Sequence, residues 1–141
     1  MQSDAMGTTL RDGRLGVLVT IKKDGRPQLS NVSYIYDPAT NVIRISVTDD
    51  RAKTRNLRRD PRASFYVANS DGNTYIVAEG TVELTPAAAD PHDAVVDELV
   101  EHYRAVRGSD HPDWDEFRAA MVEQKRVLVR LPVDRTYGLS Q

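Results

Sequence analysis

The chain has 141 residues, of which 40% are hydrophobic and 28% charged, and its formal net charge is −2. This composition is that of one globular domain and excludes an intrinsically disordered chain, a collagen-like fibre and a coiled coil. Cysteine is absent, which excludes disulfides, thiolate catalysis and cysteine-ligated metals. No apolar run is long enough to predict a membrane span, and the N-terminus lacks a signal-peptide pattern. We therefore expect a cytoplasmic protein with no membrane partner.

The first part of the chain is predicted to form short strands joined by tight turns. Residues 15–21 read LGVLVTI, an apolar, β-branched run that is typical of a buried strand. Asp-Gly pairs at 24–25 and 71–72 indicate hairpin turns, because glycine adopts a positive φ without steric cost. Residues 1–9 are expected to be a flexible N-terminus, with 1–5 as a candidate expression remnant. The predicted strands are 15–21, 27–36, 42–48, 63–68 and 74–84, the last with a bend near Gly80, and a short helix is predicted at 52–59.

The last third of the chain is predicted to begin with two helices. Apolar residues recur at helical spacing from residue 95 to residue 106, with Asp90 as the expected N-cap. A second helix is expected from about residue 112, and a final strand at 127–131 ends at Pro132. The second helix carries Trp114, Phe117 and Met121 on one face. These side chains either pack in the core or a dimer contact, or line a substrate pocket.

Tight turns between strands predict antiparallel pairing, and a closed or partly closed barrel would leave few exposed strand edges. The fold class expected is therefore mainly β, a six- to seven-stranded antiparallel barrel with flanking helices. Residues 10–141 would form a single domain, with a helical insertion at about 90–124. No βαβ alternation, GxGxxG motif or P-loop is present, so a Rossmann-type nucleotide site is not expected.

Charge is distributed unevenly along the chain. Residues 51–62 contain six basic residues and one acidic residue, a net charge of +5. Residues 90–123 contain ten acidic and three basic residues, a net charge of −7. The sequence pI near 5.9 argues against a nucleic-acid binder, and the basic segment instead predicts a local anionic ligand. The acidic segment is either a solvated cover over the barrel or a partner of the basic segment.

Few residues of the chain are typical of catalysis without a cofactor, and we predict no catalytic residue. The three histidines all lie in the acidic segment without HxxxH or HxH spacing, so no metal site is expected. We interpret these histidines as surface or helix-terminal residues, and Glu98 and His102 are spaced to pair on a helix face. No GxSxG motif marks a nucleophilic serine. The Asp49-Asp50 pair is interpreted as a solvated turn, because neighbours on a strand point to opposite faces.

The basic segment is the strongest candidate for a binding site. Arg51 and Lys53 lie between the end of a strand and the start of a helix, and Thr54 and Asn56 add uncharged hydrogen-bonding groups. Helix N-termini attract anions, arginine offers a bidentate fork and lysine a point charge. This combination suits a phosphate, and the alternative is a solvated basic helix face. Arg58 and Arg59 are expected to face solvent or to pair with the acidic segment.

Three stretches carry a resemblance to a known family. They are LGVLVTIKKDGRPQLSNVSY, IRISVTDDRAKTRNLRRDPRASFYV and YIVAEGTVEL. They resemble the pyridoxamine-5′-phosphate-oxidase-like (PPOX-class) split β-barrel family, and most closely its actinobacterial branch that uses the deazaflavin coenzyme F420. The resemblance extends from about residue 15 to residue 139. It implies a flavin-binding type of split barrel that forms a homodimer with two cofactor sites at the subunit interface.

The resemblance also implies roles for individual residues. The basic segment would hold the phosphate and the acidic tail of the cofactor, and the strand 46–48 would lie beside the deazaflavin ring. Tyr75 and the stretch 137–139 would approach from the partner subunit. The implied cofactor-binding residues are Gln28, Asn31, Ser46, Val47, Thr48, Arg51, Lys53, Thr54, Arg55, Asn56 and Tyr75.

The expected function is an F420-dependent oxidoreductase that transfers a hydride from reduced F420 to an electrophilic, unsaturated or quinone-like small molecule. A bound cofactor fits a chain with little chemistry of its own. The proton that follows the hydride would come from solvent, Tyr34 or Tyr36. Two alternatives stay open: an FMN-dependent oxidase or reductase on the same fold, and a non-catalytic F420-binding or carrier protein. A nucleic-acid binder is disfavoured, because aromatic residues are not interleaved with the basic segment.

Overall fold

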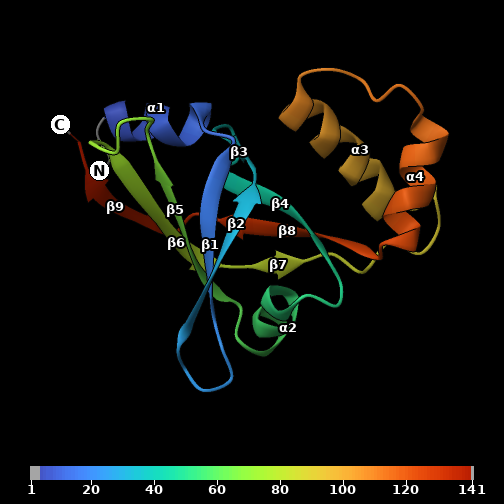
Figure 1. Cartoon of the computed structure of the whole chain (residues 1–141), viewed down its shortest axis with the longest axis horizontal. Coiled ribbons are helices and arrows are strands. Elements are labelled where there is room, and N and C mark those ends of the chain that lie inside the picture. Colours follow the sequence, from blue (N-terminus) through green and yellow to red (C-terminus); the bar gives the residue numbers. More distant parts are fainter. Residues whose placement is uncertain (1–3, 141) are drawn as a thin grey trace.

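The structure is a computed structural model that describes residues 4–140 (Figure 1). It contains two antiparallel sheets that share one apolar core, with helices at their ends and on one outer face. The mainly β, split-barrel fold class predicted from the sequence is therefore confirmed. The elements are α1 (Asp4–Asp12), β1 (Leu15–Ile21), β2 (Pro27–Ser33), β3 (Ile35–Asp37), β4 (Val42–Thr48), α2 (Ala52–Arg59), β5 (Arg62–Ala68), β6 (Tyr75–Thr81), β7 (Glu83–Leu84), α3 (Ala94–Arg107), α4 (Trp114–Glu123), β8 (Arg126–Pro132) and β9 (Arg135–Leu139).

The strands are arranged as a five-stranded and a four-stranded sheet. The first has the order β2-β1-β5-β6-β9 and the second the order β3-β4-β8-β7. In β4, Ile43, Ile45 and Val47 are buried and alternate with partly exposed residues, as expected for a strand with one face on the core. The two sheets meet where the chain passes from β2 to β3, and this junction positions β2 beside β4.

The structure has more strands than the sequence predicts because two predicted strands each contribute to both sheets. Residues 27–36 divide at Tyr34 into β2 and β3, and residues 74–84 divide at Val82 into β6 and β7. Near the expected bend, a Cβ added to Gly80 would lie 2.1 Å from the Pro132 carbonyl oxygen. Strand β6 therefore passes very close to the end of β8 at Gly80, and only glycine permits this approach. Strand β9 was not predicted at all, and it adds to the free edge of β6.

The sequence predicted a flexible N-terminus at residues 1–9, and the structure corrects this for residues 4–9. From Asp4 onward it is helix α1, and Met6 and Leu10 are buried in the barrel core. The Tyr34 hydroxyl donates a 2.6 Å hydrogen bond to the Leu10 carbonyl, which ties α1 to the end of β2. Residues 1–3 of the predicted segment lie outside the described residues. The helix was missed because only one face of a nine-residue segment is apolar, which is a weak periodic signal.

Helices α3 and α4 form a small lobe against the outer face of the second sheet (Figure 1). The N-cap of α3 is Asp93 and not the predicted Asp90, and its carboxylate accepts a 2.8 Å hydrogen bond from the Val96 N–H. Leu128 of β8 is buried in the apolar cluster of this lobe. No helix within residues 4–140 is long and apolar enough to cross a membrane.

Candidate functional site

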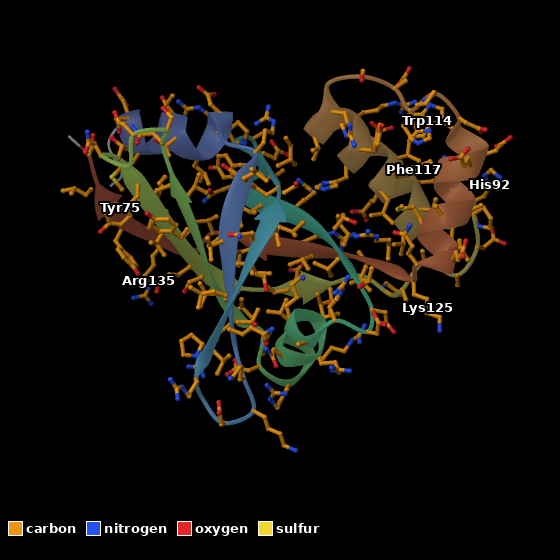
Figure 2. All side chains as sticks on the ribbon, viewed as in Figure 1. Tyr75, His92, Trp114, Phe117, Lys125 and Arg135 are labelled. Carbon is orange, nitrogen blue, oxygen red and sulfur yellow. The ribbon has the colours of Figure 1, made fainter. Side chains whose placement is uncertain are left out.

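A cleft of about 530 Å³ lies between the helical lobe and the β2–β4 side of the barrel. Its floor comes from β2, β4 and the start of α2, and its opposite wall from α3 and α4 (Figure 2). Six of the sequence-predicted cofactor residues line it, although they come from three separate elements. They are Asn31, Ser46, Val47, Thr48, Arg51 and Lys53.

One end of the cleft is strongly cationic. Arg51 is the N-cap of α2, Lys53 lies in the first turn of that helix, and Arg126 is the first residue of β8. Arg126 pairs with Thr48 across the β4–β8 ladder, and the Thr48 Oγ1 accepts a 3.3 Å hydrogen bond from Arg51 Nε. We call Arg51, Lys53 and Arg126 the cationic trio. None of the three forms a salt bridge within the described residues, and no acidic side chain of that part of the chain lines the cleft.

The members of the cationic trio repel one another. Burial lowers the pKa of Lys53 below its usual value, and the charges of Arg51 and Arg126 lower it further. Burial likewise lowers the pKa of Arg126, with a further contribution from Arg51. Like charges held together without a counter-charge are unfavourable, and a bound anion relieves that repulsion. The trio therefore fits a phosphate or a carboxylate-rich ligand.

The opposite wall is apolar and aromatic. Leu99, Tyr103 and Val106 lie at helical spacing on α3, and Phe117 and Met121 on α4 complete the wall. The rings of Tyr103 and Phe117 are 5.1 Å apart in an edge-to-face arrangement, which stabilises aromatic pairs. Trp114 does not line the cleft, although its ring lies 5.5 Å from that of Phe117 (Figure 2). Core packing therefore applies to all three residues, because Phe117 is buried in the apolar cluster of the lobe and Trp114 and Met121 pack against that cluster. Phe117 and Met121 also line the cleft.

His102 corrects the interpretation of the histidines as surface residues. It is buried at the junction of α3 with the barrel and lines both the cleft and a second cavity of about 800 Å³. Burial, with the charge of Arg44 as the second cause, lowers the pKa of His102 to about 4. His102 is therefore neutral at pH 7. The expected Glu98–His102 pair does not form, because Glu98 instead accepts hydrogen bonds from Arg130 of β8.

Five predicted cofactor residues lie outside the cleft lining. The Asn56 side chain is buried and donates to Thr20 at 3.1 Å and to Gln28 at 2.9 Å. The Thr54 hydroxyl donates to the Thr48 carbonyl at 2.7 Å. Asn56 and Gln28 therefore fix α2 against β1 and β2, and Thr54 fixes it against the end of β4. The remaining two are Arg55, exposed on α2, and Tyr75, which lies on the outer face of the five-stranded sheet (Figure 2).

The tyrosines considered as proton sources are engaged elsewhere. Tyr34 is fully buried, its hydroxyl bonds to the Leu10 carbonyl, and burial raises its pKa above the usual range. The Tyr36 hydroxyl donates to Asn41 at 2.7 Å. Neither residue lines the cleft. The proton that follows a hydride would have to come from elsewhere, and solvent is the remaining source of those predicted.

The two charged segments pair with other partners and not with each other. Arg58 forms an ion pair with Asp49, while Arg59 donates to the Ile21 carbonyl at 2.9 Å. In the acidic segment, Glu98 pairs with Arg130 of β8, and Asp97 with Arg118 of α4 at 3.0 Å. The acidic segment is thus attached to the second sheet, and the cationic trio has no salt-bridge partner among residues 4–140.

The sequence did not predict that Arg126 and the α3 side chains line the cleft, although it left pocket lining open for Phe117 and Met121. Arg126 lies 75 residues after Arg51, and nothing local connects them. Their proximity arises from the register of β8 on β4. The helical wall was visible as an apolar face, but the same pattern is typical of ordinary core packing.

Solved structures of other proteins share this fold. An F420 reductase is 24% identical, with 96% of this chain and 98% of that chain covered and a TM-score of 0.69. A conserved hypothetical protein from Mycobacterium tuberculosis is 26% identical, with 99% and 86% covered and a TM-score of 0.76. A heme binding protein from Mycobacterium smegmatis is 22% identical, with 99% and 55% covered and a TM-score of 0.67. The fold therefore serves more than one ligand, and the ligand of this chain has to be argued from its own cleft.

The sequence as a whole also matches a family model. The match covers residues 3–139, which include every strand of both sheets and the cleft between the barrel and the helical lobe. This agrees with the resemblance seen in the three sequence stretches. The chain belongs to the pyridoxamine 5′-phosphate oxidase family.

Proposed function

We propose that this protein is an F420-dependent oxidoreductase that transfers a hydride from reduced F420 to an electrophilic, unsaturated or quinone-like small molecule. The observation that carries the proposal is the cationic trio, which lies beside β4 and has no carboxylate partner in the part of the chain that the structure describes. F420 carries a phosphate and an oligoglutamate tail, so its anionic part matches this end of the cleft. A protein with the same fold is an F420 reductase, which adds support for the deazaflavin.

The residues of this chain would bind and orient the reactants. Arg51 and Lys53 would hold the phosphate through charge-assisted hydrogen bonds, and Arg126 would add charge from the neighbouring strand. Ser46 and Thr48 of β4 would lie along the ring system. The wall formed by α3 and α4 would exclude water, and this would strengthen polar interactions inside the cleft. When bound, F420 supplies the hydride chemistry that the protein's own side chains lack.

Two alternative functions would use the same cleft. An FMN-dependent oxidase or reductase would need a phosphate site but not a site for an acidic tail. A non-catalytic F420-binding or carrier protein would need the cationic trio but no acceptor. The cationic trio and the exposed Arg55 nearby on α2 together exceed what one phosphate requires, which favours F420 over FMN.

A fluorescence titration of the purified protein with oxidised F420, run in parallel with FMN, tests the proposal. The double variant Arg51→Ala/Lys53→Ala should lose about 2–4 kcal/mol of F420 binding free energy, since charge-assisted hydrogen bonds contribute about 1.5–3 kcal/mol each with incomplete additivity. Lys22→Ala/Lys23→Ala removes the same charge from the β1–β2 turn, outside the cleft, and should bind F420 as the wild type does.

Each outcome of the titration selects one function. Tight F420 binding with weak FMN binding supports the proposal, and subsequent turnover with reduced F420 and quinone acceptors separates an enzyme from a carrier. Preference for FMN would move the protein to the flavin-dependent alternative. Unchanged F420 affinity in a folded Arg51→Ala/Lys53→Ala variant would refute the assignment of the phosphate site.

We also propose that the protein is a homodimer that buries the outer face of the five-stranded sheet. A cross-strand row on this face joins Asn31, Val17, Tyr66, Val77 and Tyr137 through successive paired positions. On the same sheet, large apolar side chains are left in solvent. Leu15 is 71% exposed and Leu29 63% exposed, and Tyr66, Tyr137 and Leu139 are exposed as well.

An apolar sheet face of this kind supports association with a second copy, because monomers rarely expose contiguous apolar patches. Tyr75 and Tyr137 lie on this face, with the Tyr66 and Tyr75 rings 5.5 Å apart. This location is compatible with the expectation that they approach the cofactor of the partner subunit. Sedimentation velocity at micromolar concentration measures the oligomeric state directly.

A further inference from the structure

A second cavity borders a different face of α3 from the one that lines the cleft. Its volume is about 800 Å³, and β3, β4 and β8 form one side of it while α3 forms the other. We call this cavity the α3–β3 groove. Among the described residues, the groove shares only His102 with the cleft. A cofactor bound in the cleft therefore leaves the groove without an explanation.

We propose that the α3–β3 groove binds a small organic monocarboxylate with an apolar body, and that the guanidinium of Arg44 holds its carboxylate. The groove is then a second ligand site, separate from the one proposed for the cofactor. The inference stands independently of the oxidoreductase function.

The hydrogen-bonding state of Arg44 is the first observation behind this assignment. Arg44 lines the groove from β4, and 29% of its side chain is exposed. Its ion-pair contact among residues 4–140 is with Asp37 at 3.8 Å, and none of its N–H groups donates a hydrogen bond to those residues. The guanidinium therefore keeps its fork of donors for a ligand, and a carboxylate accepts two of them side by side.

Asp37 does not satisfy Arg44, because its carboxylate is engaged in its own turn. One oxygen accepts from the Ala39 N–H and the other from the Thr40 hydroxyl, each at 2.9 Å. These two hydrogen bonds lower the pKa of Asp37 more than the charge of Arg44 does. Asp37 is thus a turn residue first, and its distance from Arg44 lies beyond hydrogen-bond range.

The balance of charge in the groove is the second observation. Its other acidic side chains all lie on α3, and each has an arginine partner. The pairs are Asp97–Arg118, Glu98–Arg130 and Glu101–Arg104. Arg130 stands directly opposite Arg44 on the β4–β8 ladder, and like charges in that position destabilise a sheet. A carboxylate bound to Arg44 would offset this repulsion.

The apolar side chains of the groove are the third observation. Ile35 is paired with Arg44 across the β3–β4 ladder, so the two side chains lie next to each other on one face of the sheet. Tyr36, Pro38 and Ala105 also line the groove. A ligand held by Arg44 would place its apolar part against Ile35. Pockets for small organic molecules have this composition, mostly apolar with a few polar groups that fix the orientation.

Two probes of nearly the same shape test the need for a carboxylate. The first is 2-naphthoate, and the second is 2-naphthamide, in which an uncharged amide replaces the carboxylate. Both are titrated into the wild-type protein and followed by NMR. We expect 2-naphthoate to bind in the groove about tenfold tighter or more, since hydrogen bonds between charged groups are stronger than neutral ones.

Methyl resonances read the two cavities separately, which is necessary because the cationic trio of the cleft also attracts a carboxylate. Ile35 lines the groove and not the cleft, whereas Met121 lines the cleft and not the groove. In ¹³C-methyl-labelled protein, the ring current of a bound naphthyl group shifts nearby methyl signals. The dissociation constant for the groove is therefore taken from Ile35, and that for the cleft from Met121.

Variants assign the groove affinity to Arg44. Arg44→Gln removes the charge and should weaken the affinity measured at Ile35 by about tenfold or more. Arg44→Lys retains a charge without the planar fork and should give an intermediate affinity. The matched control is Arg51→Ala/Lys53→Ala, which removes two charges from the cleft. It should weaken binding measured at Met121 and leave the affinity at Ile35 unchanged.

Three results would overturn the assignment. They are the absence of an Ile35 shift up to the solubility limit of 2-naphthoate, equal affinities of the two probes at Ile35, and an unchanged affinity at Ile35 in a folded Arg44→Gln variant. The first two are measured on the wild-type protein, so the test does not depend on whether a variant folds. No F420 is added in these titrations, so their outcome and that of the F420 titration are independent.

Discussion

Acidification should destabilise this protein through His102. In the folded state burial and Arg44 lower the His102 pKa from 6.5 to about 4. In the unfolded chain the imidazole regains its ordinary pKa and binds a proton more readily. The unfolded state therefore binds more protons between these two values, so the stability that depends on neutral His102 is present above pH 6.5 and is lost as the pH falls toward 4.

The magnitude follows from the two pKa values. Moving from pH 7 to pH 5 should remove about 2 kcal/mol of unfolding free energy, and reaching pH 4 about 3 kcal/mol, given a folded pKa of about 4. Because the His102 side chain is buried, solvent screening reduces this effect little. A loss of this size is a large share of the stability of a small domain.

Urea unfolding at pH 7 and pH 5 measures the effect. The wild type is compared with His102→Gln, which does not titrate, and with His92→Gln, which removes an exposed histidine. The loss between the two pH values should be about 2 kcal/mol smaller in His102→Gln than in the wild type, and it should be unchanged in His92→Gln. An NMR titration of the His102 imidazole should give an inflection near pH 4.

Equal losses in the wild type and in His102→Gln would refute the reasoning. Such a result would mean that His102 has the same pKa in the folded and unfolded states and is not sealed from solvent by the lobe. An inflection near pH 6.5 in the NMR titration would refute it as well, from the folded state alone.

Three further changes test the packing of the fold and its assembly. Leu29→Asp places a charge on the exposed apolar sheet face and should convert the proposed dimer to a monomer in sedimentation velocity, with an unchanged circular dichroism spectrum. Asp93→Ala removes the carboxylate that accepts from the Val96 N–H at the start of α3 and should cost about 1 kcal/mol in urea unfolding. Gly80→Ala forces a Cβ against the Pro132 carbonyl at 2.1 Å and should cost about 1–3 kcal/mol or more, measured in the same way; full stability in that variant would contradict the close crossing.

The local elements could be predicted because their signals are local. Residues 42–48 alternate between core and outer face with period two, and the structure forms β4 over that range. The helix at 52–59 was bounded by the Asp60-Pro61 pair, and α2 ends at Arg59 because the residue before proline avoids the helical region. The helical lobe followed from apolar residues at helical spacing, although its first cap lies three residues later than predicted, at Asp93.

The missed elements depend on contacts far along the chain. Strand β9 has mostly exposed side chains and no apolar alternation, and it is a strand because the edge of β6 supplies its hydrogen-bond partners. Helix α1 is held by the burial of Met6 and Leu10 in the barrel. Such segments gain their stability from tertiary packing and carry little local propensity.

The candidate site likewise contains residues that the sequence predicted and residues that only the structure revealed. The sequence by itself indicated Arg51 and Lys53 as candidates for an anion site, since a basic helix start after a strand is a local pattern, and both line the cleft. Only the tertiary structure decided that Arg126 joins them, through the register of β8 on β4. It also decided that Asn56 joins α2 to β1 and β2 and that His102 is buried. A polar side chain on a helix is compatible with solvent or with a cleft, and the choice depends on what packs against that face.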